Sequence, residues 1–167
     1  MRITERTKYE VFQGVEKYLN EKQVARLKQA AEQVYGAMYD LKFGTFWACA
    51  GGDFSHLGDM TKPTVLQVYW CKRFADFIDE FTKALKTYVV PMTPEEQRAG
   101  EGLPQITWGE SMLVFLQRYF HLHSFREAEE ITTGELLIAK RAQYNEELFR
   151  RRLNKIQTQQ LKQRLKK

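Results

Sequence analysis

A row of large apolar side chains between residues 66 and 88 limits the possible folds of this chain more than any other feature. Its members follow one another at intervals of three or four residues: Leu66, Trp70, Phe74, Phe77, Phe81, Leu85 and Tyr88. This spacing places them on one face of an α-helix, whereas a half-buried strand would alternate apolar and polar residues. We therefore predict a helix that begins at Thr61 or Lys62, ends at Val90 and Pro91, and forms the centre of the core.

Helix-start signals divide the second half of the chain into further helices. In a capping box, a Ser or Thr side chain accepts a hydrogen bond from the amide three residues later, and a Glu side chain there reaches back. Three such pairs lie close together: Thr107 with Glu110, Ser124 with Glu127, and Thr132 with Glu135. They predict a long helix, a short helix that ends at Glu130, and a second long helix.

The last predicted helix carries apolar residues on two of its sides. One side holds Leu137, Tyr144 and Leu148, and the other holds Ile138, Ala142, Phe149 and Leu153. A helix with two apolar stripes must bury both of them, so this one needs two neighbours.

Two more start signals lie in the first hundred residues. Asn20 with Gln23 predicts a helix whose apolar positions alternate by three and four as far as Leu41. It forms either a coiled coil or, as we prefer, an antiparallel hairpin with an amphipathic helix over residues 5–19. Thr93, followed by Pro94 and two Glu residues, predicts a short helix that stops near Gly100.

The segment from Phe43 to Pro63 interrupts this helical pattern. Its glycines prevent a continuous helix, while its aromatic residues are too apolar for a solvated loop. We expect an irregular, packed connection. The predicted fold class is therefore all-α, a compact bundle of about five to seven helices with this irregular connection and a basic, helical C-terminal tail. A length of 167 residues suits one domain, predicted over residues 1–153, with an extension over 154–167.

Positive charge is concentrated at the end of the chain. The formal net charge is +5, yet residues 140–167 hold ten Lys or Arg and two Glu, which leaves the rest with a net negative charge. The candidate partner-binding residues are the cations of this tail: Arg150, Arg151, Arg152, Lys155, Lys162 and Arg164. A protein-docking arm or solvated helix end is favoured over nucleic-acid binding, because the tail has almost no aromatic residues to stack on bases.

No set of residues in the sequence predicts catalysis, a metal or a cofactor. Asp53, His56 and Asp59 are spaced as D-x-x-H-x-x-D, which matches no established metal site and suits turns. Acidic residues between 127 and 135 include two of the capping-box glutamates. We therefore expect a protein that is not an enzyme.

The expected cellular location follows from the lack of membrane-span and signal-peptide patterns in the sequence. No apolar run approaches the roughly 18 residues that a membrane span needs, and the N-terminal residues lack the apolar core of a signal peptide. Cys49 and Cys71 are expected to be reduced thiols rather than a disulfide. The expected compartment is the cytoplasm, with no membrane partner.

One stretch of the sequence resembles a known class of proteins. The segments ITWGESM, HLHSFREAEEIT and TGELL, within residues 103–153, are similar to bacteriophage or prophage tail-assembly-chaperone-like proteins. The positions that carry the likeness are the two helix starts: Trp108, Glu110, Thr132, Glu135 and Leu136.

This resemblance implies a small helical protein that binds another phage structural or assembly protein and makes or breaks no bond. Its partner would be a tail protein, and its location the bacterial host cytoplasm or the finished virion. The alternative function, argued from the tail alone, is a nucleic-acid-binding accessory protein. The oligomeric state does not follow from the sequence.

Overall fold

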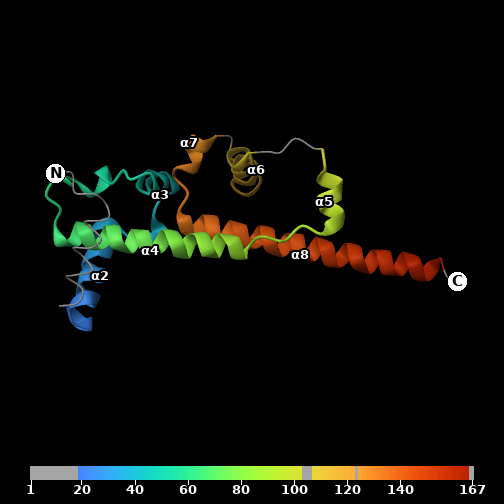
Figure 1. The fold of residues 1–167 in the computed structure, drawn as a ribbon, viewed down its shortest axis with the longest axis horizontal. Coiled ribbons are helices and arrows are strands. Elements are labelled where there is room, and N and C mark those ends of the chain that lie inside the picture. The colour runs from blue at the N-terminus through green and yellow to red at the C-terminus, as the bar shows by residue number, and fades with distance from the viewer. Residues whose placement is uncertain (1–18, 103–106, 123, 166–167) are drawn as a thin grey trace. The chain divides into compact units, whose positions relative to one another are not determined.

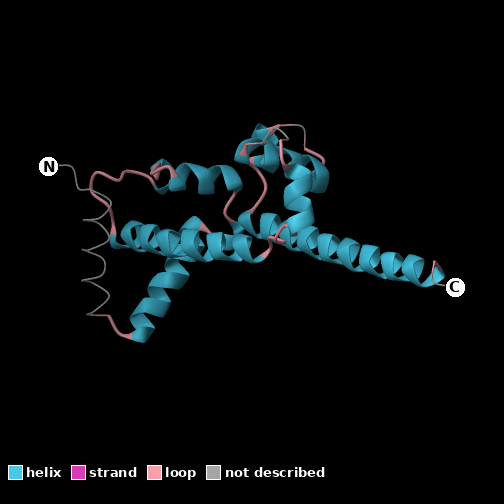
Figure 2. Ribbon diagram, turned by 45° about the vertical axis from the view of Figure 1, so that its right-hand side comes forward, coloured by secondary structure: helices cyan, strands magenta, loops and turns pink. Residues whose placement is uncertain are grey.

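The computed structural model describes residues 19–102, 107–122 and 124–165, and within them the chain is helical (Figure 1). Seven α-helices occur in these residues: α2 (Glu21–Tyr35), α3 (Phe43–Ala50), α4 (Val65–Thr87), α5 (Pro94–Gly100), α6 (Trp108–Phe120), α7 (Phe125–Ala128) and α8 (Thr133–Arg164). No described residue belongs to a strand (Figure 2). The all-α prediction is confirmed.

The contacts within the chain group into two units. Unit 1 comprises Met1–Lys83 and Arg126–Gly134, and unit 2 comprises Ala84–Phe125 and Glu135–Lys167. Most of α4 belongs to unit 1, whereas nearly all of α8 belongs to unit 2. The predicted single domain over residues 1–153 stays a prediction. The helix α8 runs without a break through residue 154, where the extension was predicted to begin.

The core of unit 1 is built on the aromatic row of α4, as the spacing predicted. Trp70, Phe74, Phe77 and Phe81 are each 1–2% exposed. The ring of Phe46, on α3, packs against three of them, with centroid distances of 5.6, 6.2 and 5.0 Å to the rings of residues 74, 77 and 81. Because a buried ring of this size contributes about 1.5–3 kcal/mol, this cluster is the main source of stability in unit 1.

The helix α4 begins at Val65, so the predicted start at Thr61 or Lys62 is wrong. The physical cause is a reciprocal pair of hydrogen bonds. The amide of Thr64 donates to Oε1 of Gln67 over 2.6 Å, and the amide of Gln67 donates to Oγ1 of Thr64 over 3.2 Å. This is a capping box with Gln in the acceptor position, and it places Pro63 before the helix.

Other parts of the chain also differ from the sequence-based expectation, and the first is the end of α4, which lies at Thr87 and not at Val90 and Pro91. The helix α2 ends at Tyr35 instead of continuing to Leu41, because Gly36 adopts a φ of 85° that turns the chain away. The connection predicted to be irregular from Phe43 to Pro63 contains a regular helix, α3. The hairpin partner predicted over residues 5–19 lies, apart from Leu19, outside the described residues.

The other predicted helix starts are largely confirmed. Asn20, Thr93 and Thr107 each form a complete capping box. The short helix α7 ends at Ala128 rather than Glu130, and α8 begins one residue after the predicted cap, Thr132.

The start of α8 is fixed within unit 1 by hydrogen bonds to the segment before α3. The amide of Thr133 donates to the carbonyl of Leu41 over 2.9 Å, and its hydroxyl donates to the carbonyl of Met38 over 2.9 Å. Gly134 follows at a point of close approach, where a Cβ atom would lie 2.9 Å from the carbonyl oxygen of Tyr39. Only a residue without a side chain fits there.

Replacing Phe77 by alanine is expected to lower the free energy of unfolding by about 3–5 kcal/mol, because a fully buried ring leaves a cavity. The matched control is Val65→Ala on the same helix, where the side chain is 57% exposed, so the change should stay within about 0.5 kcal/mol. Urea unfolding followed by circular dichroism measures both values. Similar losses for the two variants would show that the core does not lie on α4.

Gly134→Ala is expected to destabilise the protein by about 1–3 kcal/mol, because the added methyl group meets a backbone carbonyl that has little room to move. Gly100→Ala serves as the control, since a Cβ atom at Gly100 meets nothing within 4 Å. That change should be neutral or slightly stabilising, given the better helix propensity of alanine. Thermal unfolding compares them, and an unchanged midpoint for Gly134→Ala would contradict the described approach of Tyr39.

Candidate protein-docking helix

The helix α8 presents two different faces along its 32 residues. Residues at intervals of three and four share a face of a helix. Lys140, Tyr144 and Arg151 lie on the inner face and contact other parts of unit 2. The opposite, outer face holds an apolar row of Ile138, Ala142, Phe149, Leu153 and Ile156, which we call the docking row. Of these residues, Ile138 is 71% exposed, Phe149 64%, Leu153 41% and Ile156 51%. The prediction that the last helix buries both of its apolar stripes is therefore wrong for this stripe.

The inner face is held by ring contacts near the middle of the helix. The ring of Tyr144 lies 6.1 Å from that of Tyr88, measured between centroids. The ammonium nitrogen of Lys140 lies 3.9 Å from the centroid of the Phe115 ring, which is a close cation–π contact. The hydroxyl of Tyr119 donates to Glu146 over 2.8 Å, and Arg118 pairs with the same carboxylate over 2.9 Å. The Tyr88 contact joins α8 to the segment after α4, and the other contacts join α8 to α6.

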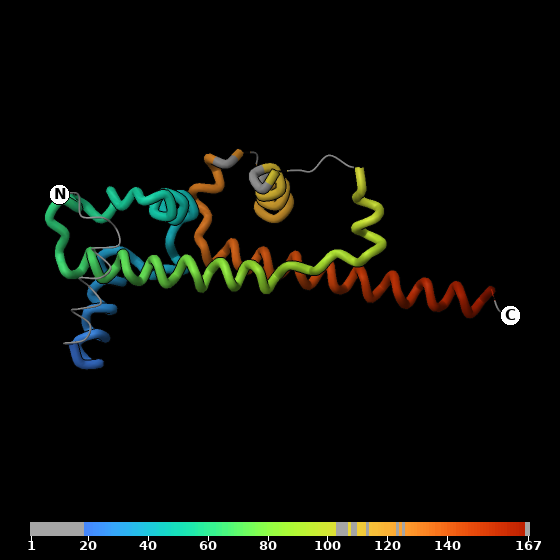
Figure 3. Tube along the Cα trace, viewed as in Figure 1, coloured from blue at the N-terminus to red at the C-terminus, as the bar shows by residue number. Residues whose placement is uncertain are grey.

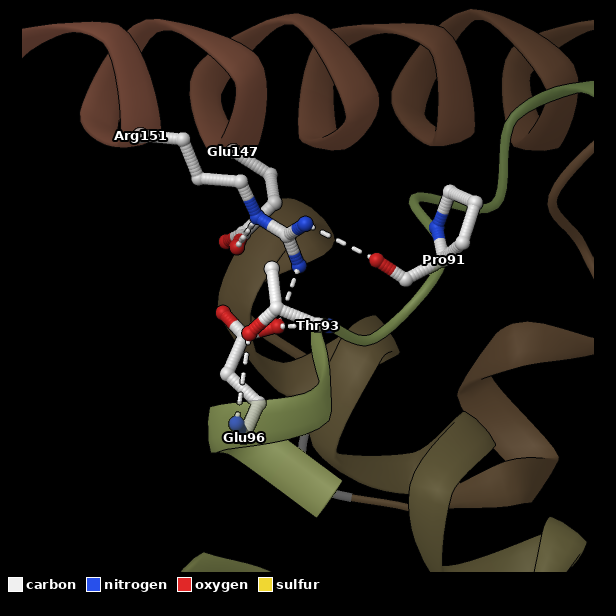
Figure 4. A network of polar contacts seen from close by, with 5 residues as sticks. All are labelled: Pro91, Thr93, Glu96, Glu147 and Arg151. Carbon is white, nitrogen blue, oxygen red and sulfur yellow. Dashed lines mark hydrogen bonds and ion pairs between the residues drawn. The ribbon is translucent and has the colours of Figure 1, made fainter. Parts of the chain in front are cut away.

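Arg151 closes the inner face by bridging α8 to α5 (Figure 4). Its guanidinium donates to the Pro91 carbonyl over 2.8 Å, to Glu96 over 2.9 Å and to Glu147 over 3.1 Å. Glu96 also accepts the amide of Thr93 over 2.7 Å, which completes the cap of α5. We call this set of contacts the Arg151 clasp. It uses the donors of a side chain that the sequence had assigned to partner binding.

The carboxylates that hold α8 are stabilised in their charged form. The hydrogen bond from the Thr93 amide, and then the charge of Arg151, lower the pKa of Glu96 below its ordinary value. The hydrogen bond from the Tyr119 hydroxyl is the main reason that the pKa of Glu146 is lowered. Both side chains therefore stay negative around neutral pH.

The C-terminal part of α8, red in the tube, continues past α5 (Figure 3), and we call its residues from 152 onward the arm. Every described residue from 152 onward is exposed. Four of the six predicted partner-binding cations lie on this arm and make no hydrogen bond or ion pair within the described residues: Arg152, Lys155, Lys162 and Arg164. Of the other two, Arg150 pairs with Glu146 over 2.8 Å and Arg151 forms the clasp. Two of the six predicted cations are therefore paired within the chain, and the other four are available to a partner.

The D-x-x-H-x-x-D motif is used in turns. Oδ1 of Asp53 accepts the amide of Ser55 over 2.9 Å, and Oδ1 of Asp59 accepts the amide of Thr61 over 2.8 Å. These hydrogen bonds lower the pKa of both carboxyl groups. His56 lies beside the ring of Trp70. Among the residues that the structure describes, no group of three His, Cys, Asp or Glu side chains is placed to hold a metal ion.

Cys49 lies next to His56, with 3.7 Å between Sγ and Nδ1. Such a pair resembles a nucleophile with its base, but the pKa of the Cys49 thiol is raised to about 12, mainly by burial. A thiol with this pKa is almost entirely protonated at neutral pH and therefore a poor nucleophile. Neither cysteine of the described chain forms a disulfide.

The acidic residues near α7 have structural roles in unit 1. Glu130 pairs with Lys42, and the Glu129 side chain packs against Gly44. They therefore add no acid–base pair to the candidate site.

No protein-family model matches the chain, and neither a curated protein nor a solved structure matches it. Within the described ranges, none of the helices combines the length and apolar character that crossing a bilayer requires.

The pH dependence of stability is expected to change in Glu96→Gln. A carboxyl group whose pKa is lowered on folding stabilises the folded state above its unfolded pKa, near 4.5, and this contribution disappears as the pH falls through the folded pKa. Gln can still accept the Thr93 amide but does not titrate. The urea midpoint should therefore fall less between pH 7 and pH 3 in this variant than in the wild type.

The control for this measurement is Glu95→Gln, at a neighbouring carboxylate that makes no hydrogen bond or ion pair within the described residues. Its midpoint should follow the wild-type pH profile. If Glu96→Gln also keeps the wild-type profile, the Glu96 carboxylate is not held by the Thr93 amide and Arg151 as described.

Proposed function

We propose that this protein is a non-enzymatic assembly protein that binds another protein through the docking row of α8. The observation that carries this proposal is the exposure of four large apolar side chains on the face of α8 opposite its packed face. Exposed apolar area at this density marks interaction sites in other proteins. The row runs from Ile138 to Ile156, about 27 Å of helix, which suits the binding of a second helix.

The charges beside the docking row define the chemistry of its partner. By helical geometry, Arg152 lies on one side of the row, and Arg164, eight residues beyond Ile156, lies on the other side of its continuation. The sequence from residue 148 to 167 contains no acidic residue. A partner helix with an apolar stripe flanked by Glu or Asp is therefore complementary. A second copy of the arm would bring like charges together, which disfavours self-association.

The resemblance to phage tail-assembly chaperones narrows the class of partner. In that setting the bound protein is a tail-tube or tape-measure protein, held during assembly in the bacterial cytoplasm or retained in the virion. The resemblance supports this assignment through the helix starts near residues 108 and 133. The docking row supports only the binding of a helix.

The second candidate function is nucleic-acid binding by the arm. The four cations that have no partner within the described residues favour it, because each phosphate contact releases counterions and adds affinity. It leaves the docking row without a role, and the arm offers no aromatic side chain for base stacking. We therefore rank it below protein binding.

The expected result for the docking row is loss of the partner in the double variant Phe149→Ala, Ile156→Ala. Tail proteins encoded beside this gene are co-expressed with the tagged protein, and their binding is measured by calorimetry. The double variant should weaken binding at least tenfold while its unfolding midpoint changes little, because both side chains are exposed. Gln159→Ala, on another face of the arm, is the matched control and should bind normally.

Two results would contradict the proposal. One is a gene neighbourhood that contains no phage genes, together with the finding that no protein encoded by a neighbouring gene binds this protein. The other is a complex that the double variant leaves intact. Nucleic-acid binding predicts instead an affinity for duplex DNA that falls steeply with salt, is reduced by Arg152→Gln with Lys155→Gln, and is indifferent to the apolar substitutions.

A further inference from the structure

Unit 2 contains an open groove on the inner face of α8, opposite the docking row. Its volume is about 550 Å³, which is within the range of sites that bind ligands of drug size. Residues 88–90 and Met92, which follow α4, form one wall, and α8 from Lys140 to Arg151 forms another. All the residues that line it belong to unit 2.

Lys140 is the unusual group of this groove. Its side chain is half-buried against the Phe115 ring, and its ammonium donates to Oε1 of Gln143 over 3.1 Å. No carboxylate of the described chain pairs with it. Burial lowers the pKa of this ammonium. A partly desolvated cation without an anion is costly, and a carboxylate from outside would offset that cost.

The remaining charges of the groove lie toward its other end. Arg151 there is shared by two carboxylates, Glu96 and Glu147. That end therefore has an excess of one negative charge, while Lys140 supplies one positive charge. An acidic ligand is attracted to Lys140 and repelled from the Arg151 clasp, so the two ends give the ligand a direction.

The wall beside these charges is apolar and open to solvent. Val89 is 63% exposed and Met92 is 69% exposed. Met side chains adapt to varied apolar partners. From Lys140 to Arg151 the groove follows α8 for about 16 Å, a length that an extended segment of about five residues spans. A short stretch of polypeptide fits this length better than a compact small molecule.

We propose that this groove binds an extended segment of a partner polypeptide whose Asp or Glu pairs with Lys140 and whose neighbouring apolar side chain packs on Val89 and Met92. The site lies on the opposite face of α8 from the docking row and does not rest on the proposed function. In the bound partner segment, a Lys or Arg about three to five residues from the Asp or Glu is also favoured, because it would lie beside Glu147.

The test is selection of random displayed heptapeptides on the full-length protein. The enriched peptides should carry an acidic residue next to an apolar one. Synthesised with blocked ends, they should bind wild type at least tenfold more tightly than Lys140→Met, which keeps the aliphatic stem and removes the charge. Replacing the peptide acid by its amide should cause a similar loss, and Lys140→Arg should restore most of the affinity.

The double variant Phe149→Ala, Ile156→Ala provides the matched control, because it changes only the docking row. Peptide affinity should be unchanged in it, whether or not the docking row binds a partner helix. Nitrogen-15 spectra of wild type should show shifts at residues 88–92 and 140–147 on peptide addition. Failure to enrich any peptide, or enriched peptides that are indifferent to Lys140→Met and to loss of their acid, would overturn the proposal.

Discussion

The helix α8 packs against the rest of unit 2 along one face only, and the functional interpretation depends on this packing. Lys140 over the Phe115 ring and Tyr144 beside Tyr88 hold the middle of the helix, and the Arg151 clasp ends the packed region. Because a helix has 3.6 residues per turn, fixing this face directs residues 138, 149 and 156 away from unit 2. The docking row is therefore a consequence of how the inner face packs.

The energies of these contacts differ in a way that matters for function. The aromatic cluster on α4 buries whole rings, whereas the Arg151 pair is partly exposed, with side-chain exposures of 28% and 44% for Arg151 and Glu96. Pairs of this kind contribute about 0–1 kcal/mol. Stability thus resides mainly in buried rings, while the clasp sets where α5 lies against α8. The two proposed binding sites occupy regions where little core packing would be lost by substitution.

How much of the structure could be predicted depended on whether the deciding contact was local. The α4 rings were predictable because helical spacing appears within the sequence itself, and the caps at Asn20, Thr93 and Thr107 involve residues three apart. The start of α4 was missed because Pro63, which suits a first helical turn, favoured a start at Thr61 or Lys62 over the capping box of Thr64 and Gln67. The helix α3 was missed because burial of Phe46 against α4, a tertiary contact, outweighs the glycines beside it.

The parts of the candidate site likewise differ in whether the local sequence predicts them. The two apolar stripes of α8 and its cations were visible in the sequence, and the exposed row follows the second stripe. The clasp was not visible, because Arg151 and Glu96 are 55 residues apart. The only local signal was the spacing of four between Glu147 and Arg151, which is common on solvated helices. The groove at Lys140 likewise needed the position of Phe115, which no pattern near residue 140 indicates.

Amide hydrogen exchange along α8 in the full-length protein tests the one-sided packing of this helix most directly. Amides from residue 140 to 151 should be strongly protected, and protection should fall by about a hundredfold or more beyond Arg151, since an arm whose described residues are all exposed opens locally. Addition of the partner should restore protection in the arm. Uniformly high protection to residue 164 in the unbound protein would contradict the described packing, because the arm would then be held by contacts that leave no face for a partner.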